Sequence, residues 1–259
     1  MVITWTLAAA LLLSVAIGLA LGLLGGGGSI LTVPILTYVL GMEPQHAITA
    51  SLFVVGVTAL VSMARHARAG RVAWRTGTVF GLAGMTGALV GGLVGSLIPG
   101  TVLMVLFAAM MIATSVAMMR PRRGDAPVDG EPPPRRGWRV LAEGFAVGLA
   151  TSLVGAGGGF LVVPALALLG GLPMAVAVGT SLLVIAMQSS AGLMAHLVTV
   201  SLDWPVVLMV TAAAIVGSFL GTALVGRIPE RSLRTGFGVF VLLMGVVVLA
   251  QEVPGLIPG

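Results

Sequence analysis

The segment Leu23-Leu24-Gly25-Gly26-Gly27-Gly28-Ser29-Ile30 places four consecutive glycines inside an otherwise apolar stretch. The segment Leu153-Val154-Gly155-Ala156-Gly157-Gly158-Gly159-Phe160 repeats this pattern in the second half of the chain. Glycine clusters interrupt a helix, and irregular backbone at membrane depth is tolerated only where protein or a water-filled cavity satisfies it. The two segments therefore predict a matched pair of broken helices, and the rest of the fold follows from them.

The composition assigns the chain to the membrane proteins. Of its 259 residues, 58% are hydrophobic and only 8% are charged, with a mean hydropathy of +1.15. A soluble domain is about one quarter charged, so too few charges remain here to cover a water-soluble globule. Cysteine is absent, which excludes disulfides, thiolate metal sites and cysteine nucleophiles. All thirteen basic residues are arginines in three clusters, which is typical of cytoplasmic loops and not of a nucleic-acid-binding face.

Long apolar stretches predict the membrane helices, and they neither alternate in polarity nor match the length of barrel strands. They are residues 5–24, 29–40, 47–64, 76–98 and 102–119, and then 140–154, 160–169, 175–197, 205–225 and 233–249. The uncharged start of the chain does not resemble the positive n-region of a secretory signal, so we expect the first stretch to stay in the mature fold.

The two halves of the chain are copies of each other at a single constant offset that needs no gap. The matching pairs include Pro34 and Pro164, Ser51 and Ser181, His66 and His196, and Trp74 and Trp204. Residues 120–139 separate the copies with six arginines, five prolines and three acids, which predicts a flexible cytoplasmic linker. We therefore divide the chain into a first transmembrane repeat, 1–119, the linker, 120–139, and a second repeat, 140–259.

The arginines predict that the copies are inverted. The first copy carries its arginines between the third and fourth stretches, and the second copy carries them one loop later; they are Arg65, Arg68, Arg71 and Arg75, and then Arg227, Arg231 and Arg234. Positive charge marks the cytoplasmic side, so equivalent loops lie on opposite sides of the membrane. We expect a multi-pass protein of the cell (inner) membrane with both termini outside.

The predicted fold class is an all-α polytopic membrane protein built from two inverted-topology repeats. In each repeat, a glycine-broken helix pair or a re-entrant hairpin precedes three spanning helices. Residues 29–40 would span only about 18 Å as a helix, which favours an element shorter than a full crossing.

The broken helices are the predicted anion site, because a helix that starts after a break presents free N–H groups and the positive end of its dipole. The candidate backbone positions are Gly25, Gly26, Gly27, Gly28 and Ser29 in the first copy, and Gly155, Gly157, Gly158 and Gly159 in the second. The alternative is that these glycines allow close helix packing. Four consecutive glycines exceed what packing needs, so the site interpretation is favoured.

Polar side chains within the stretches complete the candidate site. The matched Ser51 and Ser181 follow the break in both copies, and Thr180 and Gln188 add further donors in the second copy. The alternative for a hydroxyl in a membrane helix is a hydrogen bond to its own backbone. Gln188 corresponds to Thr58 in the first copy, a difference that could give the site its asymmetry.

Other chemistries are not supported by the sequence. No carboxylate or arginine lies in the middle of a stretch, and His66 and His196 fall at stretch ends, where a histidine is most often interfacial. Nucleotide-binding, metal-binding and hydrolase motifs are absent, so we expect neither an enzyme nor a cofactor or metal.

The chain resembles the TauE/SafE family of membrane permeases, which are sulfite or organosulfonate exporters. The resemblance rests on G-L-L-G-G-G-G-S-I-L-T-V-P at residues 22–34 with T-A-S-L-F at 49–53, and on S-L-V-G-A-G-G-G-F-L-V-V-P at 152–164 with G-T-S-L at 179–182. It covers nearly the whole chain. It implies transport of small sulfur-containing anions such as sulfite or short sulfonates.

Export of an anion agrees with the absence of buried carboxylates, because the negative cell interior drives it by about 2.3 kcal/mol per 100 mV. The leading prediction is therefore a secondary transporter, an exporter of small anions, with membrane lipid and the anion as partners and a homodimer as one possible assembly. An anion channel and a structural subunit of a larger membrane complex remain the alternatives, and an intramembrane enzyme is disfavoured.

Overall fold

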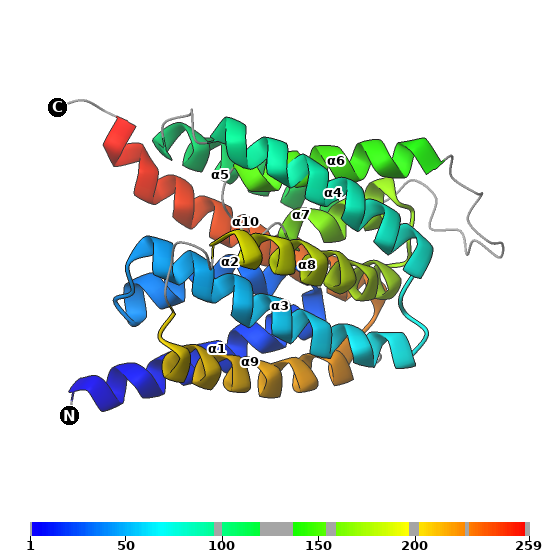
Figure 1. Cartoon of the computed structure of the whole chain (residues 1–259). Coiled ribbons are helices and arrows are strands. Elements are labelled where there is room, and N and C mark those ends of the chain that lie inside the picture. The colour runs from blue at the N-terminus through cyan, green and yellow to red at the C-terminus, as the bar shows by residue number, and fades with distance from the viewer. Residues whose placement is uncertain are drawn as a thin grey trace.

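A computed structural model describes residues 2–95, 100–119, 137–153, 159–196, 202–225 and 228–256. All regular secondary structure in these residues is helical (Figure 1). The helices coincide closely with the apolar stretches, because the hydropathy pattern that marks a stretch also marks the helix. The predicted all-α fold is therefore confirmed.

The elements follow the same order in both copies. The first copy contains α1 (Val2–Leu24), α2 (Gly27–Pro34), the π-helix η1 (Ile35–Val39), α3 (Pro44–Arg68), α4 (Trp74–Gly95) and α5 (Gly100–Met119). The second contains α6 (Gly137–Leu153), α7 (Gly159–Pro164), the π-helix η2 (Ala165–Leu169), α8 (Met174–His196), α9 (Trp204–Val225) and α10 (Glu230–Leu256). Each first helix is thus followed by a short helix that continues into a π-turn. Most of the predicted linker, residues 120–136, lies outside the described residues.

Both copies end this short element with the same turn. Gly41 and Gly171 have φ values of +67° and +65°, a left-handed conformation that only glycine adopts at little cost. The turn is closed in each copy by an N–H···O=C bond of 3.1 Å, from Met42 to Leu36 and from Leu172 to Leu166. The matching sequences therefore fold into matching local structures.

Helices of one copy pack mainly against helices of the other. Helix α1 pairs with α9, and the equivalent helices α6 and α4 pair with each other (Figure 1). Between these two pairs lies the pair formed by α3 and α8, while α2 contacts α7 and α5 contacts α10. The two copies are therefore interlocked, with α2, α3, α7 and α8 at the centre.

Glycines allow the two outer pairs to approach closely. A Cβ on Gly221 would overlap the carbonyl of Leu19, and a Cβ on Gly91 would overlap the carbonyl of Leu149. These two contacts are related by the same constant offset that relates the two halves of the sequence. Small residues at such crossings are characteristic of helix packing in membranes, where backbones approach without a hydrophobic driving force.

Helices α3 and α8 run in opposite directions. A Cβ on Gly56 would lie 3.2 Å from the Cβ of Ser189, and a Cβ on Gly179 would lie 3.1 Å from the Cβ of His66. The middle of α3 therefore faces the later part of α8, and the end of α3 faces the start of α8.

The outer surface is apolar. Large aliphatic side chains point outward from several helices, including Leu12, Leu82, Leu89, Val216 and Leu243. Within the described residues, three helical segments are long and apolar enough to cross a membrane: Thr49–Arg68, Met174–Ala191 and Trp204–Val225. This exterior suits lipid, because apolar side chains on this scale would expose the chain to aggregation in water.

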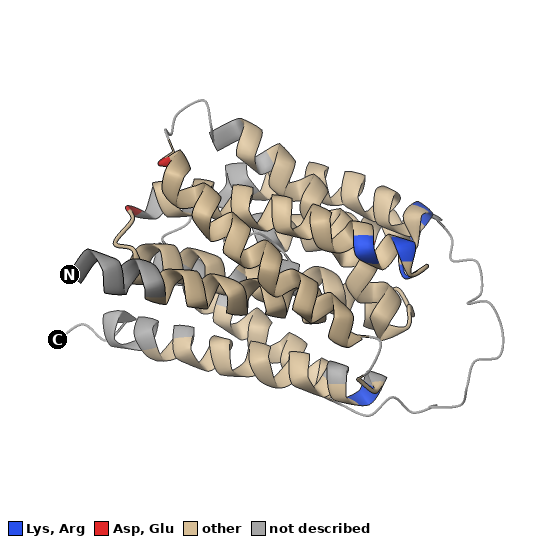
Figure 2. Cartoon of the chain, turned by 90° about the horizontal axis from the view of Figure 1, so that it is seen from below, with Lys and Arg blue, Asp and Glu red and all other residues tan. Residues whose placement is uncertain are grey.

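Charged residues gather at the two ends of the bundle. Figure 2 shows the basic residues toward one end and the acidic residues that it draws toward the other. Helix α1 begins, and helix α10 ends, where the two chain ends lie (Figure 1), and Figure 2 shows these ends opposite the basic residues. Arg65 lies at the basic end and is held on α9, with its guanidinium 4.7 Å from the ring centroid of Phe219.

Candidate functional site

The first predicted break is a sharp turn between α1 and α2. Gly25 has a φ of +72°, and its N–H donates to the carbonyl of Leu21 at 2.9 Å, which ends α1. The carbonyl of Gly26 then accepts the hydroxyl of Ser29 at 2.7 Å. This turn reverses the chain, so α2 packs back against α1. The glycine cluster therefore produces the predicted interruption.

Gly25 lies against the second copy of the repeat. A Cβ at this position would be 2.6 Å from Oγ of Ser181 on α8 and 2.8 Å from a methyl group of Val163 on α7. Both distances are shorter than real Cβ contacts, so only glycine fits here. The turn of the first copy thus closes onto the short helix and the following long helix of the second copy.

The other glycines of the first break differ in their surroundings. Helix α2 begins at Gly27, with Gly26 as its N-cap residue and no side-chain cap. Gly28 faces back onto α1, where a Cβ would lie 2.9 Å from the Cβ of Leu21. Close packing therefore accounts for Gly28, whereas Gly25 faces the other copy.

The second predicted break falls mainly on residues that the structure does not describe. Gly155, Gly157 and Gly158 lie outside the described residues, and Gly159 is the first residue of α7. Helix α7 contacts both α2 and α8. The short helices that follow the two glycine clusters are therefore brought together.

The predicted polar side chains lie on the two central helices. Ser51 is buried on α3, and Ser181 is buried on α8 with its hydroxyl donating to the carbonyl of Val178 at 2.8 Å. Thr180 accepts the N–H of Ala73 at 3.0 Å through Oγ1, which ties the loop after α3 to α8. An accepting hydroxyl still has its own hydrogen to donate. In this conformation the Ser181 hydroxyl is bonded to the backbone of its own helix and not directed to a ligand.

Gln188 extends from α8 toward α4. Its Nε2 is buried and has no hydrogen-bond partner among the described residues. A Cβ on Gly84 would overlap this nitrogen, so Gly84 provides the space that the amide occupies. A buried donor without an acceptor costs about 1–3 kcal/mol, and such a donor is what an anion requires.

The sequence-based reasoning missed a row of polar side chains on α3. Thr58, Ser62 and His66 follow each other at four-residue intervals and so lie along one helix face. All three are buried, and Thr58 Oγ1, Ser62 Oγ and His66 Nδ1 have no hydrogen-bond partner among the described residues. His66, expected at the membrane interface, is fully buried within the protein, with a residue exposure of 0%. The four-residue spacing was the available signal.

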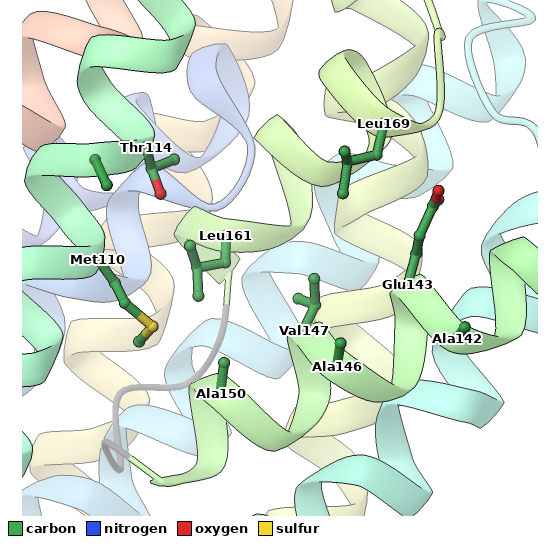
Figure 3. Close-up of a pocket in the computed structure, with 10 residues that line it drawn as sticks. Met110, Thr114, Ala142, Glu143, Ala146, Val147, Ala150, Leu161 and Leu169 are labelled. Carbon is green, nitrogen blue, oxygen red and sulfur yellow. The ribbon is translucent and has the colours of Figure 1, made fainter.

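The structure also contains an open groove of about 520 Å³. It lies between α5, α6 and α7 and is lined by apolar side chains, with Thr114 and Glu143 as exceptions (Figure 3). None of its lining residues belongs to the predicted site, and an apolar wall with a carboxylate does not favour an anion. In the described part of the chain, no cluster of histidine and acidic side chains could hold a metal ion.

The interlocked helices, the apolar exterior and the glycine turn at the centre define a multi-pass integral membrane protein. The chain belongs to the sulfite exporter TauE/SafE family, whose model matches residues 10–248. This is a family of membrane transporters, and the predicted resemblance is confirmed.

Curated relatives share this class. A probable membrane transporter protein of Xylella fastidiosa (strain 9a5c) is 34% identical over 238 residues, which are 90% of this chain and 91% of the relative. The probable membrane transporter protein YunE of Bacillus subtilis (strain 168) is 27% identical over 258 residues, covering 89% and 94% of the two chains. No solved structure matches the chain at a significant level.

Proposed function

We propose that this protein is a secondary transporter that exports small sulfur-containing anions such as sulfite or short organosulfonates. The family name points to this substrate class. The chemistry of the centre supports an anion. Among the described residues, the buried side-chain atoms without hydrogen-bond partners are hydroxyls, the Nδ1 of His66 and the Nε2 of Gln188. The hydroxyls and the amide can donate, and none of these groups is a carboxylate.

The observation that carries the proposal is the contact between Gly25 and Ser181. It places the glycine turn of the first copy against α7 and α8 of the second, where a side chain would fill the space. We propose that the first-turn N–H groups of α2 and the buried donors of α3 and α8, with Gln188 among them, bind the anion. Backbone N–H groups can hold an anion where no basic side chain is present.

An inverted-repeat architecture would give this site its access to both sides. The opposite directions of the equivalent helices α3 and α8, and the recurrence of the same glycine contacts in both copies, support that architecture. Transporters with inverted repeats bind substrate at the repeat interface and expose it alternately by rocking one part against the other. The gathering of arginines at one end supports a cytoplasmic location for that end.

Uptake into liposomes tests the proposal. Purified protein is reconstituted and given labelled sulfite, sulfate, sulfoacetate, taurine or acetate over a range of concentrations. We expect saturable uptake of sulfite or sulfoacetate and little uptake of acetate. Flux that rises linearly with concentration would indicate a channel, and rates equal to those of protein-free liposomes for every sulfur anion would refute the assignment.

A further inference from the structure

The row of polar side chains on α3 leads from the centre of the molecule to its basic end. Thr58 lies near the middle of α3, Ser62 one turn later, and His66 one turn after that, close to the last residue, Arg68. Three consecutive turns therefore bury a polar atom that has no partner among the described residues. Burying such groups is costly, so their alignment calls for a role that packing does not supply.

His66 stands next to the proposed anion site on two sides. Its Nε2 lies 3.2 Å from the carbonyl oxygen of Gly22, three residues before the turn at Gly25. On α8 its Cβ faces Gly179, two residues before Ser181. His66 thus contacts α1 through its ring and α8 through its Cβ. The turn that follows α1 meets the same helix α8 at the contact between Gly25 and Ser181.

The protonation of the ring follows from these contacts. A carbonyl oxygen only accepts, so Nε2 carries a hydrogen and donates to Gly22. In the neutral ring, Nδ1 then holds a lone pair, and this atom is buried without a partner in the described structure. Nδ1 can take up a proton without breaking the bond from Nε2 to Gly22.

Within the described residues, the helices packed on α3 beside His66 bring no negative charge to a protonated ring. Helices α1 and α9 contain no titratable side chain, and the only one in α8 is His196, its last residue. The charged groups that act on the ring are cationic: Arg65 on α3 and Arg71 in the following loop. The other basic residues of this part of the chain are Arg68, the last residue of α3, and Arg75 in the first turn of α4. Glu43, the acid next to α3, precedes its first residue, about 35 Å along the helix from His66.

We infer that His66 binds a proton together with the transported anion, so that the protein is a proton–anion symporter; this rests on the function proposed above. The anion supplies the negative charge that a buried imidazolium lacks, and the imidazolium places a positive charge directly beside the anion. In a low-dielectric interior the two charges stabilise each other strongly, so they bind and cross together. The proton binds at Nδ1 from one side of the membrane and is released from Nδ1 to the other side. Ser62, one helical turn before His66, is the polar group that precedes it in the row on α3. Carrying both lowers the net charge moved through the apolar interior. Export then requires an outward gradient of the anion that exceeds the inward gradient of the proton.

Two transport measurements distinguish proton coupling by His66 from a role in anion binding alone. Exchange of labelled external sulfite for unlabelled internal sulfite needs no net proton movement, whereas net uptake driven by an inward proton gradient does. Both are measured in liposomes at zero membrane potential, set with potassium and valinomycin. Because sulfite itself can take up a proton, the decisive comparison is between variants and not with protein-free liposomes.

The variants are His66→Gln and, as a matched control, His46→Gln. His46 is a half-exposed histidine at the start of the same helix, where it pairs with Glu43 at 3.4 Å. We expect wild type and His46→Gln to respond to a gradient of one pH unit with up to tenfold accumulation, the limit for one proton per anion. His66→Gln, whose amide can still donate to Gly22, should need several-fold more sulfite for half-maximal exchange, because the imidazolium no longer attracts the anion. It should still exchange at saturating sulfite and should lose the response to the gradient.

Each other outcome contradicts the inference. A normal gradient response in His66→Gln would show that the proton is carried elsewhere. Loss of exchange together with net uptake would assign His66 to binding or folding. If wild type moves sulfite but ignores the gradient, the symport is refuted while the proposed function stands. If wild type moves no sulfite in either mode, the proposed function fails as well.

Discussion

Gly25 of the first copy and Ser181 of the second meet so closely that a single methyl group on Gly25 would lie 2.6 Å from the serine hydroxyl oxygen. The two residues are separated by more than a full repeat in sequence, and each follows a feature that the two copies share. Their contact joins the broken helix of one copy to a central helix of the other. Conformation and contact both require glycine here, and these two requirements can be separated by experiment.

Stability measurements separate the conformational requirement for glycine at position 25 from the requirement set by its contact with Ser181. Gly25→Ala and Gly41→Ala both place a side chain at a positive φ, which costs about 1–2 kcal/mol, but a Cβ on Gly41 meets nothing within 4 Å. We expect Gly25→Ala to lower the thermal midpoint clearly more than Gly41→Ala. Adding Ser181→Ala to Gly25→Ala should recover part of the difference. Equal midpoints for the two single variants would mean that the contact carries no energy.

The packing of α1 on α9 and of α4 on α6 should be energetically equivalent. Gly91→Ala and Gly221→Ala each drive a methyl group into the facing backbone, at Leu149 and Leu19 respectively. Overpacking of this kind costs about 1–3 kcal/mol, so we expect similar losses of stability in detergent. Gly236→Ala, in α10 with open space at its Cβ, is the control and should be neutral or stabilising by up to about 1 kcal/mol. A large difference between the first two variants would contradict the equivalence of the two pairs.

Replacing Gln188 should raise the stability of the protein and lower its rate of transport. Replacing it with Met removes a buried donor that has no partner in the described structure while keeping most of the volume. We expect Gln188→Met to gain about 1 kcal/mol of stability and to transport sulfite more slowly. Ser190→Ala is the control. Because the Ser190 hydroxyl already donates to the carbonyl of Ala186, its loss should change transport little. Unchanged transport in Gln188→Met would remove this residue from the site.

Thiol labelling tests the orientation, and the native chain contains no cysteine to interfere. Arg68→Cys and Arg231→Cys should react with an impermeant reagent from the cytoplasmic side only. Asp203→Cys, in an exposed position before α9, should react from the outside only. Labelling of positions 68 and 203 from the same side would contradict inverted repeats.

The helices and the position of the first break were predictable because hydropathy and glycine clustering are local signals. The sequence predicted that Gly25 and Ser181 belong to the same site. It did not predict their direct contact, because that contact depends on how the helices pack. Gly28 shows the limit of pattern reasoning: it belongs to the same cluster, yet it serves the packing of α2 on α1.

The burial of His66 was not predictable from the sequence, for a physical reason. Three arginines follow or precede it closely, which is typical of a helix end at the membrane surface, and a histidine there is usually interfacial. Contacts to His66 come from α1, where the carbonyl of Gly22 meets Nε2, and from α8, where Gly179 leaves room for the Cβ of His66. A contact between residues so distant in sequence leaves no local signal, although the spacing of Thr58, Ser62 and His66 did show that they share a face.

Sulfite uptake by Gly25→Ala compared with Gly41→Ala, per folded molecule in liposomes, tests the central claim most directly. Both variants carry the same backbone strain, but only the first fills the space beside Ser181. We predict that Gly41→Ala transports within about twofold of wild type and that Gly25→Ala, although folded, loses transport by at least about tenfold, equivalent to about 1.4 kcal/mol. Equal transport by the two variants would place the anion site away from the glycine turn and contradict the account.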